Sequence, residues 1–179
     1  IIKDFWFDFG NPADIIILSC FLGSIKKFKK LFWRNKRFEI IPARSPKAVE
    51  KAVEDLQRGQ VIVCPTDTVY GFLADATNDK AVQRIFDIKG REKDKPLPVF
   101  IKNIEMAKKY ALIDEGMEAF LDEIWPGKIT VALLNKENSD LSLLICGNKK
   151  TVGLRIPDHK LIKEILEKVN KPLTGTSAN

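Results

Sequence analysis

The chain has 179 residues, of which 45% are hydrophobic and 30% charged, and these values exclude a disordered chain and allow one well-buried domain. The net charge is +6, yet residues 41–179 hold 22 Lys/Arg against 20 Asp/Glu, so the strongly basic domain typical of nucleic-acid binding is not indicated. The three cysteines form no CxxC pair, which argues against a zinc site or a disulfide framework, and no apolar run approaches the roughly 20 residues that cross a bilayer. We therefore predict a cytoplasmic protein without a membrane segment.

Residues 1–40 differ from the rest, with 8 Lys/Arg against 4 Asp/Glu. A basic and aromatic stretch at 25–37 fits an interfacial helix, but equally a piece of an unrelated upstream domain or a poorly bounded reading frame. We assign 1–40 no role and hypothesise that it is not part of the domain. Both ends of the chain are expected to be cut, because the first methionine is Met106 and Asn179 falls inside a motif.

From residue 41 onward, caps and apolar periodicity predict alternating helices and strands. Ser45 is expected to cap a first helix that Gly59 ends. A buried strand over 60–64 follows, and Pro65 ends it because proline has no N–H to donate.

The alternation continues to the end of the chain. Thr77 is expected to cap a helix through Phe86, and Asp158 a helix through Val169. Further helices are predicted over 103–110 and 114–124, and further strands over 72–74, 97–101, 129–135, 141–145, 151–156 and 172–175. Because no repeat or linker interrupts this order, we predict one α/β domain over 41–179.

Two stretches suggest a ligand site. The segment 65–71 places two hydroxyls, a carboxylate and an aromatic ring directly after a strand, where an open α/β sheet has its ligand crevice. Lys89 and Arg91 follow and flank Gly90. From these stretches alone, a site for a polar and anionic ligand and a plain turn beside a solvated charge run are equally good interpretations.

Five segments taken in order carry a more specific signal. They read PTDTVYG at 65–71, KGR at 89–91 with KPL at 95–97, WPGKIT at 125–130, TVGLRIP at 151–157 and SAN at 177–179. Their order and spacing resemble the YrdC-like family, the threonylcarbamoyl-AMP synthases of tRNA modification, over about residues 45–179. The resemblance implies a twisted, open, mixed α/β sheet with flanking helices around a concave cavity. It also implies that L-threonine, bicarbonate and ATP give threonylcarbamoyl-AMP and pyrophosphate, and that downstream proteins transfer the product to tRNA.

The resemblance assigns four residues to L-threonine: Thr68, Phe100, Arg155 and Gly175. A planar guanidinium at a strand end can hold a carboxylate by two hydrogen bonds, which suits Arg155, although an ion pair with Asp158 explains this arginine equally well. Many family members have a histidine at or near the position of Phe100, so one threonine contact is expected to be apolar here.

The nucleotide end rests on the same resemblance. Lys89 and Arg91 match the paired cations and are expected to offset phosphoryl charge during transfer. The ATP contacts implied are Arg91, Lys95, Thr151, Ser177 and Asn179. No metal-ligand cluster is visible in the sequence, so Mg²⁺ is expected only as the partner of ATP. Since the family continues past Ser-Ala-Asn, part of the nucleotide site is expected to be missing.

Two alternatives remain open. The same fold could bind double-stranded RNA or tRNA, or it could be the carbamoyl-adenylate-forming domain of a hydrogenase-maturation carbamoyltransferase. The near-neutral 41–179 region favours the enzyme over an RNA-binding module, and 1–40 lacks the cysteine motifs expected to precede the hydrogenase-maturation domain. The single histidine, His159, is interpreted as a capping or surface residue.

Overall fold

The structure, a computed structural model, describes residues 14–18 and 38–178. The 25–37 stretch and Asn179 lie outside this part of the chain. The helices are α2 (Lys47–Gln57), α3 (Asp79–Lys89), α4 (Ile104–Tyr110), α5 (Glu115–Ile124), α6 (Leu143–Cys146) and α7 (Lys160–Val169). The strands are β1 (Asp14–Leu18), β2 (Phe38–Pro42), β3 (Val61–Cys64), β4 (Gly71–Leu73), β5 (Val99–Phe100), β6 (Val131–Leu134), β7 (Thr151–Arg155), β8 (Leu173–Thr174) and β9 (Thr176–Ser177). None of the helices in the described ranges is both long and apolar enough to cross a membrane.

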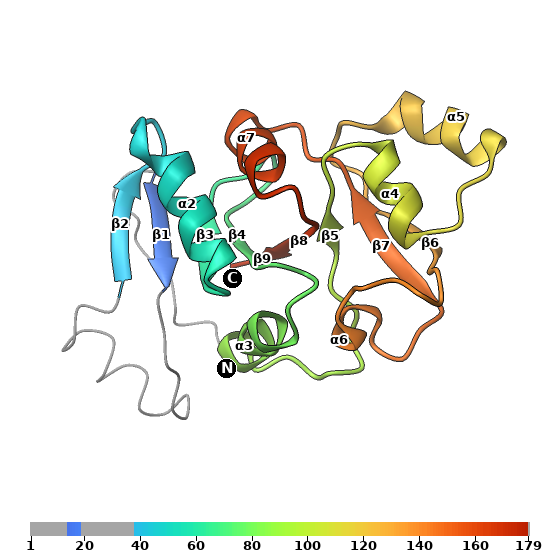
Figure 1. Cartoon of the computed structure of the whole chain (residues 1–179), viewed down its shortest axis with the longest axis horizontal. Helices are drawn as coiled ribbons and strands as arrows, with labels where there is room; N and C mark the ends of the chain where they lie inside the picture. Colours follow the sequence, from blue (N-terminus) through green and yellow to red (C-terminus); the bar gives the residue numbers. More distant parts are fainter. Residues whose placement is uncertain (1–13, 19–37, 179) are drawn as a thin grey trace.

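The strands form two open sheets that lie side by side (Figure 1). The first has the order β2-β1-β3-β4-β9 and is antiparallel throughout, whereas the second, β6-β7-β5-β8, contains the parallel pair β5–β7. Thr174 of β8 joins the sheets, because its backbone N–H donates to Ala74 O at 2.9 Å and its hydroxyl accepts from Ala74 N–H at 2.9 Å. The predicted mixed α/β fold with flanking helices is confirmed.

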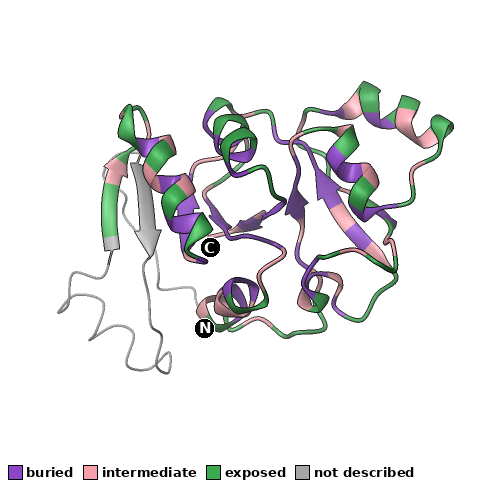
Figure 2. Cartoon of the chain, viewed as in Figure 1, coloured by how far each residue is buried: buried purple, intermediate pink, exposed green. Residues whose placement is uncertain are grey.

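Strand β3 is buried on both faces, and this explains its uninterrupted apolar sequence. Because side chains alternate along a strand, Val61 and Val63 join one apolar cluster, while Ile62 and Cys64 join the other. Helices α2 and α7 contribute buried residues to the second cluster, and α3 contributes to the first. Each of these helices carries both buried and exposed residues (Figure 2). Cys64 is fully buried in this core, and its burial raises the pKa of the thiol.

Helix α3 begins later and ends later than the sequence predicts. Asn78 caps it by accepting from two backbone N–H groups, whereas the Thr77 hydroxyl donates to Asp75 at 2.6 Å, so Thr77 as the cap was wrong. The helix continues to Lys89 and ends at Gly90, whose φ of +59° suits glycine. Lys89 therefore lies on the last turn of a rigid helix and not in a loop.

Two other expectations were wrong. The run 141–145 is a loop followed by the short helix α6, not a strand; short apolar runs cannot be assigned from periodicity alone. Helix α7 has His159 at its N-cap position without a capping bond from the imidazole, while the Asp158 carboxylate instead pairs with Lys163 at 2.7 Å. At the first predicted helix, Ser45 lies one position before the observed N-cap, yet its hydroxyl still accepts from Lys47 N–H at 3.3 Å.

Part of the N-terminal segment lies in the first sheet. Strand β1 pairs with β2 on one side and with β3 on the other. This pairing favours including residues 14–18 in the domain, while the proposed boundary at residue 41 stays a prediction. The sequence contains no signal for the pairing beyond the apolar run at 15–18.

Candidate active site

The 65–71 segment forms a compact turn between β3 and β4. The Thr66 hydroxyl donates to Val69 O at 2.7 Å and accepts from Thr68 N–H at 3.1 Å. The Thr66 and Thr68 hydroxyls lie 3.0 Å apart. Thr68 is exposed and lies on a turn that these hydrogen bonds stabilise, a position from which its hydroxyl can reach a ligand.

Arg155 ends strand β7, and its guanidinium is held by two other predicted motifs. Nη2 pairs with Asp67 at 2.5 Å, and Nε donates to Gly127 O at 2.8 Å. Both charged side chains are only 7% exposed. The alternative ion pair with Asp158 was wrong, because the Asp158 carboxylate pairs with Lys163, and the Asp158 N–H donates to Asp67.

The Phe100 ring packs against the guanidinium of Arg155. The guanidinium carbon lies 5.5 Å from the centroid of the Phe100 ring, a distance typical of a cation–π contact. Gly175 leaves room for that ring, because a Cβ built on Gly175 would lie 2.6 Å from Phe100 Cδ1 and 2.7 Å from Cζ. Phe100 itself is 3% exposed. Phe100 is thus a buried core residue whose ring contacts both Arg155 and Gly175, and its contact with threonine stays a prediction.

Lys89 and Ser177 are in contact beside Gly71, the last residue of the 65–71 turn. The Lys89 ammonium donates to Ser177 O and lies 5.8 Å from the centroid of the Phe72 ring. Ser177 pairs with Gly71 in the β4–β9 ladder. Burial, together with the nearby Arg91 charge, lowers the pKa of Lys89 from that of an ordinary lysine.

Arg91 and Lys95 shape a loop beside α6. The Arg91 side chain donates to Lys95 O at 3.3 Å and to Pro96 O at 3.0 Å, so part of its guanidinium stabilises its own loop. Lys95 is exposed and pairs with Glu92 at 2.8 Å. Gly147, with φ +54°, packs against this loop, and a Cβ there would lie 2.8 Å from Pro96 N.

Five of the predicted residues fall into two groups. Arg155, Phe100 and Gly175 form one, and Lys89 and Ser177 form the other; the 65–71 turn contacts both. Thr151 lies at the opposite end of β7 from Arg155, about 13 Å away at roughly 3.3 Å per residue. Thr151 therefore does not join the Arg155 group.

Three residues to which the sequence assigned no individual role shape the site: Asp67, Gly127 and Gly147. Asp67 and Gly127 lie inside the segments that carry the resemblance, so their position along the chain was the available signal. Their role as partners of Arg155 has no signal in the sequence, because Asp67 and Arg155 are 88 positions apart.

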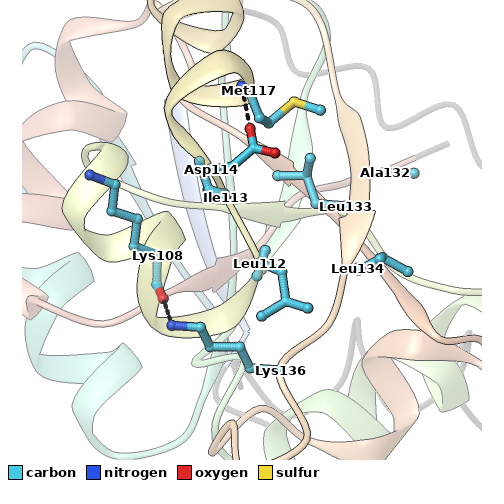
Figure 3. A pocket seen from close by; sticks show the side chains of 10 residues that line it. Lys108, Leu112, Ile113, Asp114, Met117, Ala132, Leu133, Leu134 and Lys136 are labelled. Carbon is cyan, nitrogen blue, oxygen red and sulfur yellow. Dashed lines mark hydrogen bonds between the residues drawn. The ribbon is translucent and has the colours of Figure 1, made fainter.

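A separate hollow of about 650 Å³ lies between α4, α5 and β6 and is lined by none of the predicted site residues (Figure 3). Its polar groups are already engaged. Lys108 pairs with Glu118 at 2.6 Å, the Lys136 ammonium donates to Lys108 O at 2.5 Å, and Asp114 caps α5. Among the described residues, no cluster of three or more His, Cys, Asp or Glu could hold a metal ion.

The lowered pKa of Lys89 gives a testable pH dependence. If this ammonium binds phosphate, ATP affinity should begin to fall at a lower pH than the ordinary lysine value of 10.5 allows, because Lys89 loses its charge earlier. A Lys89→Arg variant should keep its affinity over the same range, since a guanidinium stays charged above pH 12. Titration of a non-hydrolysable ATP analogue from pH 7 upward, with folding followed by circular dichroism, measures both.

Lys93→Arg is the matched control, because Lys93 is an exposed lysine of the neighbouring loop that is not assigned to ATP, so the alkaline fall should stay as in wild type. An identical alkaline fall in wild type and Lys89→Arg would contradict the assignment of Lys89 to phosphate.

Comparison with known proteins decides the family. The Sua5/YciO/YrdC family model, described as "Telomere recombination", matches residues 54–179. The chain belongs to this family. A putative threonylcarbamoyl-AMP synthase of Methanocaldococcus jannaschii is 33% identical over 80% of the chain, and the threonylcarbamoyl-AMP synthase of Pyrococcus abyssi is 35% identical over 69%.

A solved Sua5/YciO/YrdC structure gives the same result. P. abyssi Sua5 in complex with L-threonine has 34% sequence identity, with a TM-score of 0.69 over 74% of this chain and 38% of that one. The chain spans 66% of the length of the M. jannaschii relative and 36% of the P. abyssi relative.

Proposed function

We propose that the protein forms threonylcarbamoyl-AMP from L-threonine, bicarbonate and ATP and releases pyrophosphate. The observation that carries this proposal is the meeting of distant segments around the 65–71 turn: the buried Arg155 pairs with Asp67, and Lys89 contacts Ser177, which pairs with Gly71. A guanidinium suits a carboxylate, and paired cations suit a triphosphate. The naming of relatives as threonylcarbamoyl-AMP synthases supports the same reading over the RNA-binding and hydrogenase-maturation alternatives.

Each group has a physical task in this reaction. Arg155 binds the carboxylate of L-threonine, because a carboxylate needs a charged partner. Thr68 orients the same substrate, because its hydroxyl is a polar partner for the threonine hydroxyl or ammonium. Lys89 and Arg91 offset the charge that builds up on phosphate oxygens as pyrophosphate leaves. Lys95, Thr151, Ser177 and Asn179 are proposed as further ATP contacts. These cations and hydroxyls fit a nucleotide that arrives with Mg²⁺, and the ion would add charge neutralisation at the phosphates.

The wider setting follows from the chemistry of the product. An activated threonylcarbamoyl group is useful only if another protein transfers it, so we propose that downstream proteins transfer the group. We propose tRNA as the final acceptor and the cytoplasm as the compartment.

Pyrophosphate release tests the proposal. We expect release only when L-threonine, bicarbonate and ATP are all present, and we expect Lys89→Ala to lower it by about 100-fold, as removal of one stabilising donor does elsewhere. Lys93→Ala, which changes an exposed lysine of the same loop, is the control and should keep the wild-type rate. Equal release without threonine would overturn the proposal.

A further inference from the structure

The Asp67–Arg155 pair poses an electrostatic problem that the proposed function leaves unsolved. An arginine that is to receive a carboxylate already holds one, at 2.5 Å. Asp67 is not a loose partner, because its second oxygen accepts the Asp158 N–H at 3.1 Å and its side chain is only 7% exposed. The pair is therefore built into the site.

The hydrogen bonds of Arg155 leave part of its guanidinium unused. Nε donates to Gly127 O, and Nη2 donates to Asp67. Among the residues that the structure describes, no hydrogen bond donated by Nη1 is found. A guanidinium has five N–H donors, so both N–H groups of Nη1 and the second N–H of Nη2 remain.

Three contacts fix the plane of the guanidinium. Gly127 O and Asp67 fix its in-plane rotation, and the Phe100 ring, 5.5 Å from the guanidinium carbon, supports its face. A planar fork held in this way needs no ordering when a carboxylate arrives, and this preorganisation strengthens binding. Asp67 also compensates the charge of a 7%-exposed guanidinium while no ligand is bound.

We propose that Asp67 is a positioning residue, which holds Arg155 so that its remaining N–H donors, those of Nη1 among them, receive the carboxylate of the amino-acid substrate. This inference rests on the proposed function. Asp67 acts through Arg155 and does not itself touch the substrate, since a direct approach would bring two carboxylates together. The alternative is a brace that joins the 65–71 turn to the 155–158 loop and has no bearing on ligand affinity.

The test compares the binding of L-threonine, L-threonine amide and a non-hydrolysable ATP analogue to wild type and Asp67→Asn by calorimetry. Asparagine keeps the shape but loses the negative charge that pairs with the guanidinium. We expect the affinity for L-threonine to fall by roughly 10- to 100-fold. Affinity for L-threonine amide, which lacks the carboxylate, should be weak and equal in both proteins, and ATP-analogue affinity should change less than about 2-fold.

Asp158→Asn is the matched control. Asp158 is adjacent, but its carboxylate lies on the surface against Lys163, and only its backbone contacts Asp67. It should bind all three ligands as wild type does. If Asp67→Asn does not fold, Asp67→Glu keeps the charge and lengthens the arm by one methylene. Because the geometry of the pair changes, threonine affinity should fall while folding persists.

The outcomes separate the two claims. If wild type binds L-threonine and an Asp67 variant binds it equally well, only the positioning role of Asp67 is overturned. An Asp67 variant that loses threonine and ATP-analogue binding to the same extent also overturns it, in favour of the brace. Wild type that does not bind L-threonine overturns the proposed function and, with it, the carboxylate part of this proposal.

Discussion

Arg155→Ala is expected to destabilise the protein by about 3–5 kcal/mol, because it leaves the Asp67 carboxylate buried without its partner. It should also weaken L-threonine binding by roughly 30- to 1000-fold, the range for loss of a charge-assisted bidentate contact in a cavity. Urea unfolding measures the first effect, and calorimetric titration with threonine the second. Arg155→Lys should recover only part of the affinity, since an ammonium cannot reproduce the fork.

Two further variants define the origin of the loss. Asp67→Ala combined with Arg155→Ala should recover part of the stability, because the second substitution removes the carboxylate that Arg155→Ala leaves unpaired. Arg58→Ala removes an arginine that is 62% exposed and pairs with Glu54 on the surface, so it should change the free energy of unfolding by less than about 1 kcal/mol. An Arg155→Ala variant as stable as Arg58→Ala would contradict the buried ion pair.

Gly175→Ala is expected to destabilise the fold by about 1–3 kcal/mol, because its new methyl group would overlap the buried Phe100 ring. Displacing that ring removes the support under Arg155, so threonine affinity should fall as well. Thermal unfolding and threonine titration check the two effects.

A double-mutant cycle with Phe100→Leu tests the proposed cause. A smaller side chain at position 100 should lower the cost of Gly175→Ala, which would appear as a favourable interaction energy. Gly116→Ala is the control, because a Cβ there would meet only Asp114 Oδ1 at 3.7 Å, and alanine favours the helix. Strict additivity of Gly175→Ala and Phe100→Leu would show that the ring is not the obstacle.

The sequence by itself determined most of the elements that have strong local signals. Asn103 and Asp114 precede amphipathic runs, and both cap the helices expected there. The β3 strand and its end at Pro65 follow from an apolar run and a residue without an N–H. The two-face burial of β3 and the division into two sheets depend on packing between distant segments, so no local pattern predicts them.

Where two local signals compete, the tertiary structure decided. Thr77 and Asn78 are both good caps, and the choice of Asn78 follows because the Thr77 hydroxyl donates to Asp75, which also pairs with Lys171. The apolar run 141–145 fits a strand or a short helix equally well. In the structure the run ends in the short helix α6. Ile145 O accepts a hydrogen bond from the distant Leu97 N–H, and Gly147 follows the helix with a φ of +54°.

The candidate site divides in the same way. The residue types and their order along the chain identify which segments carry the chemistry, because a cation pair, a strand-end arginine and a hydroxyl-rich turn are visible one at a time. Which atoms meet depends on the fold: Asp67 pairs with Arg155 across 88 positions, and Lys89 reaches Ser177 across another 88. Local sequence specifies conformation within a few residues, whereas contacts of this separation exist only once both sheets have formed.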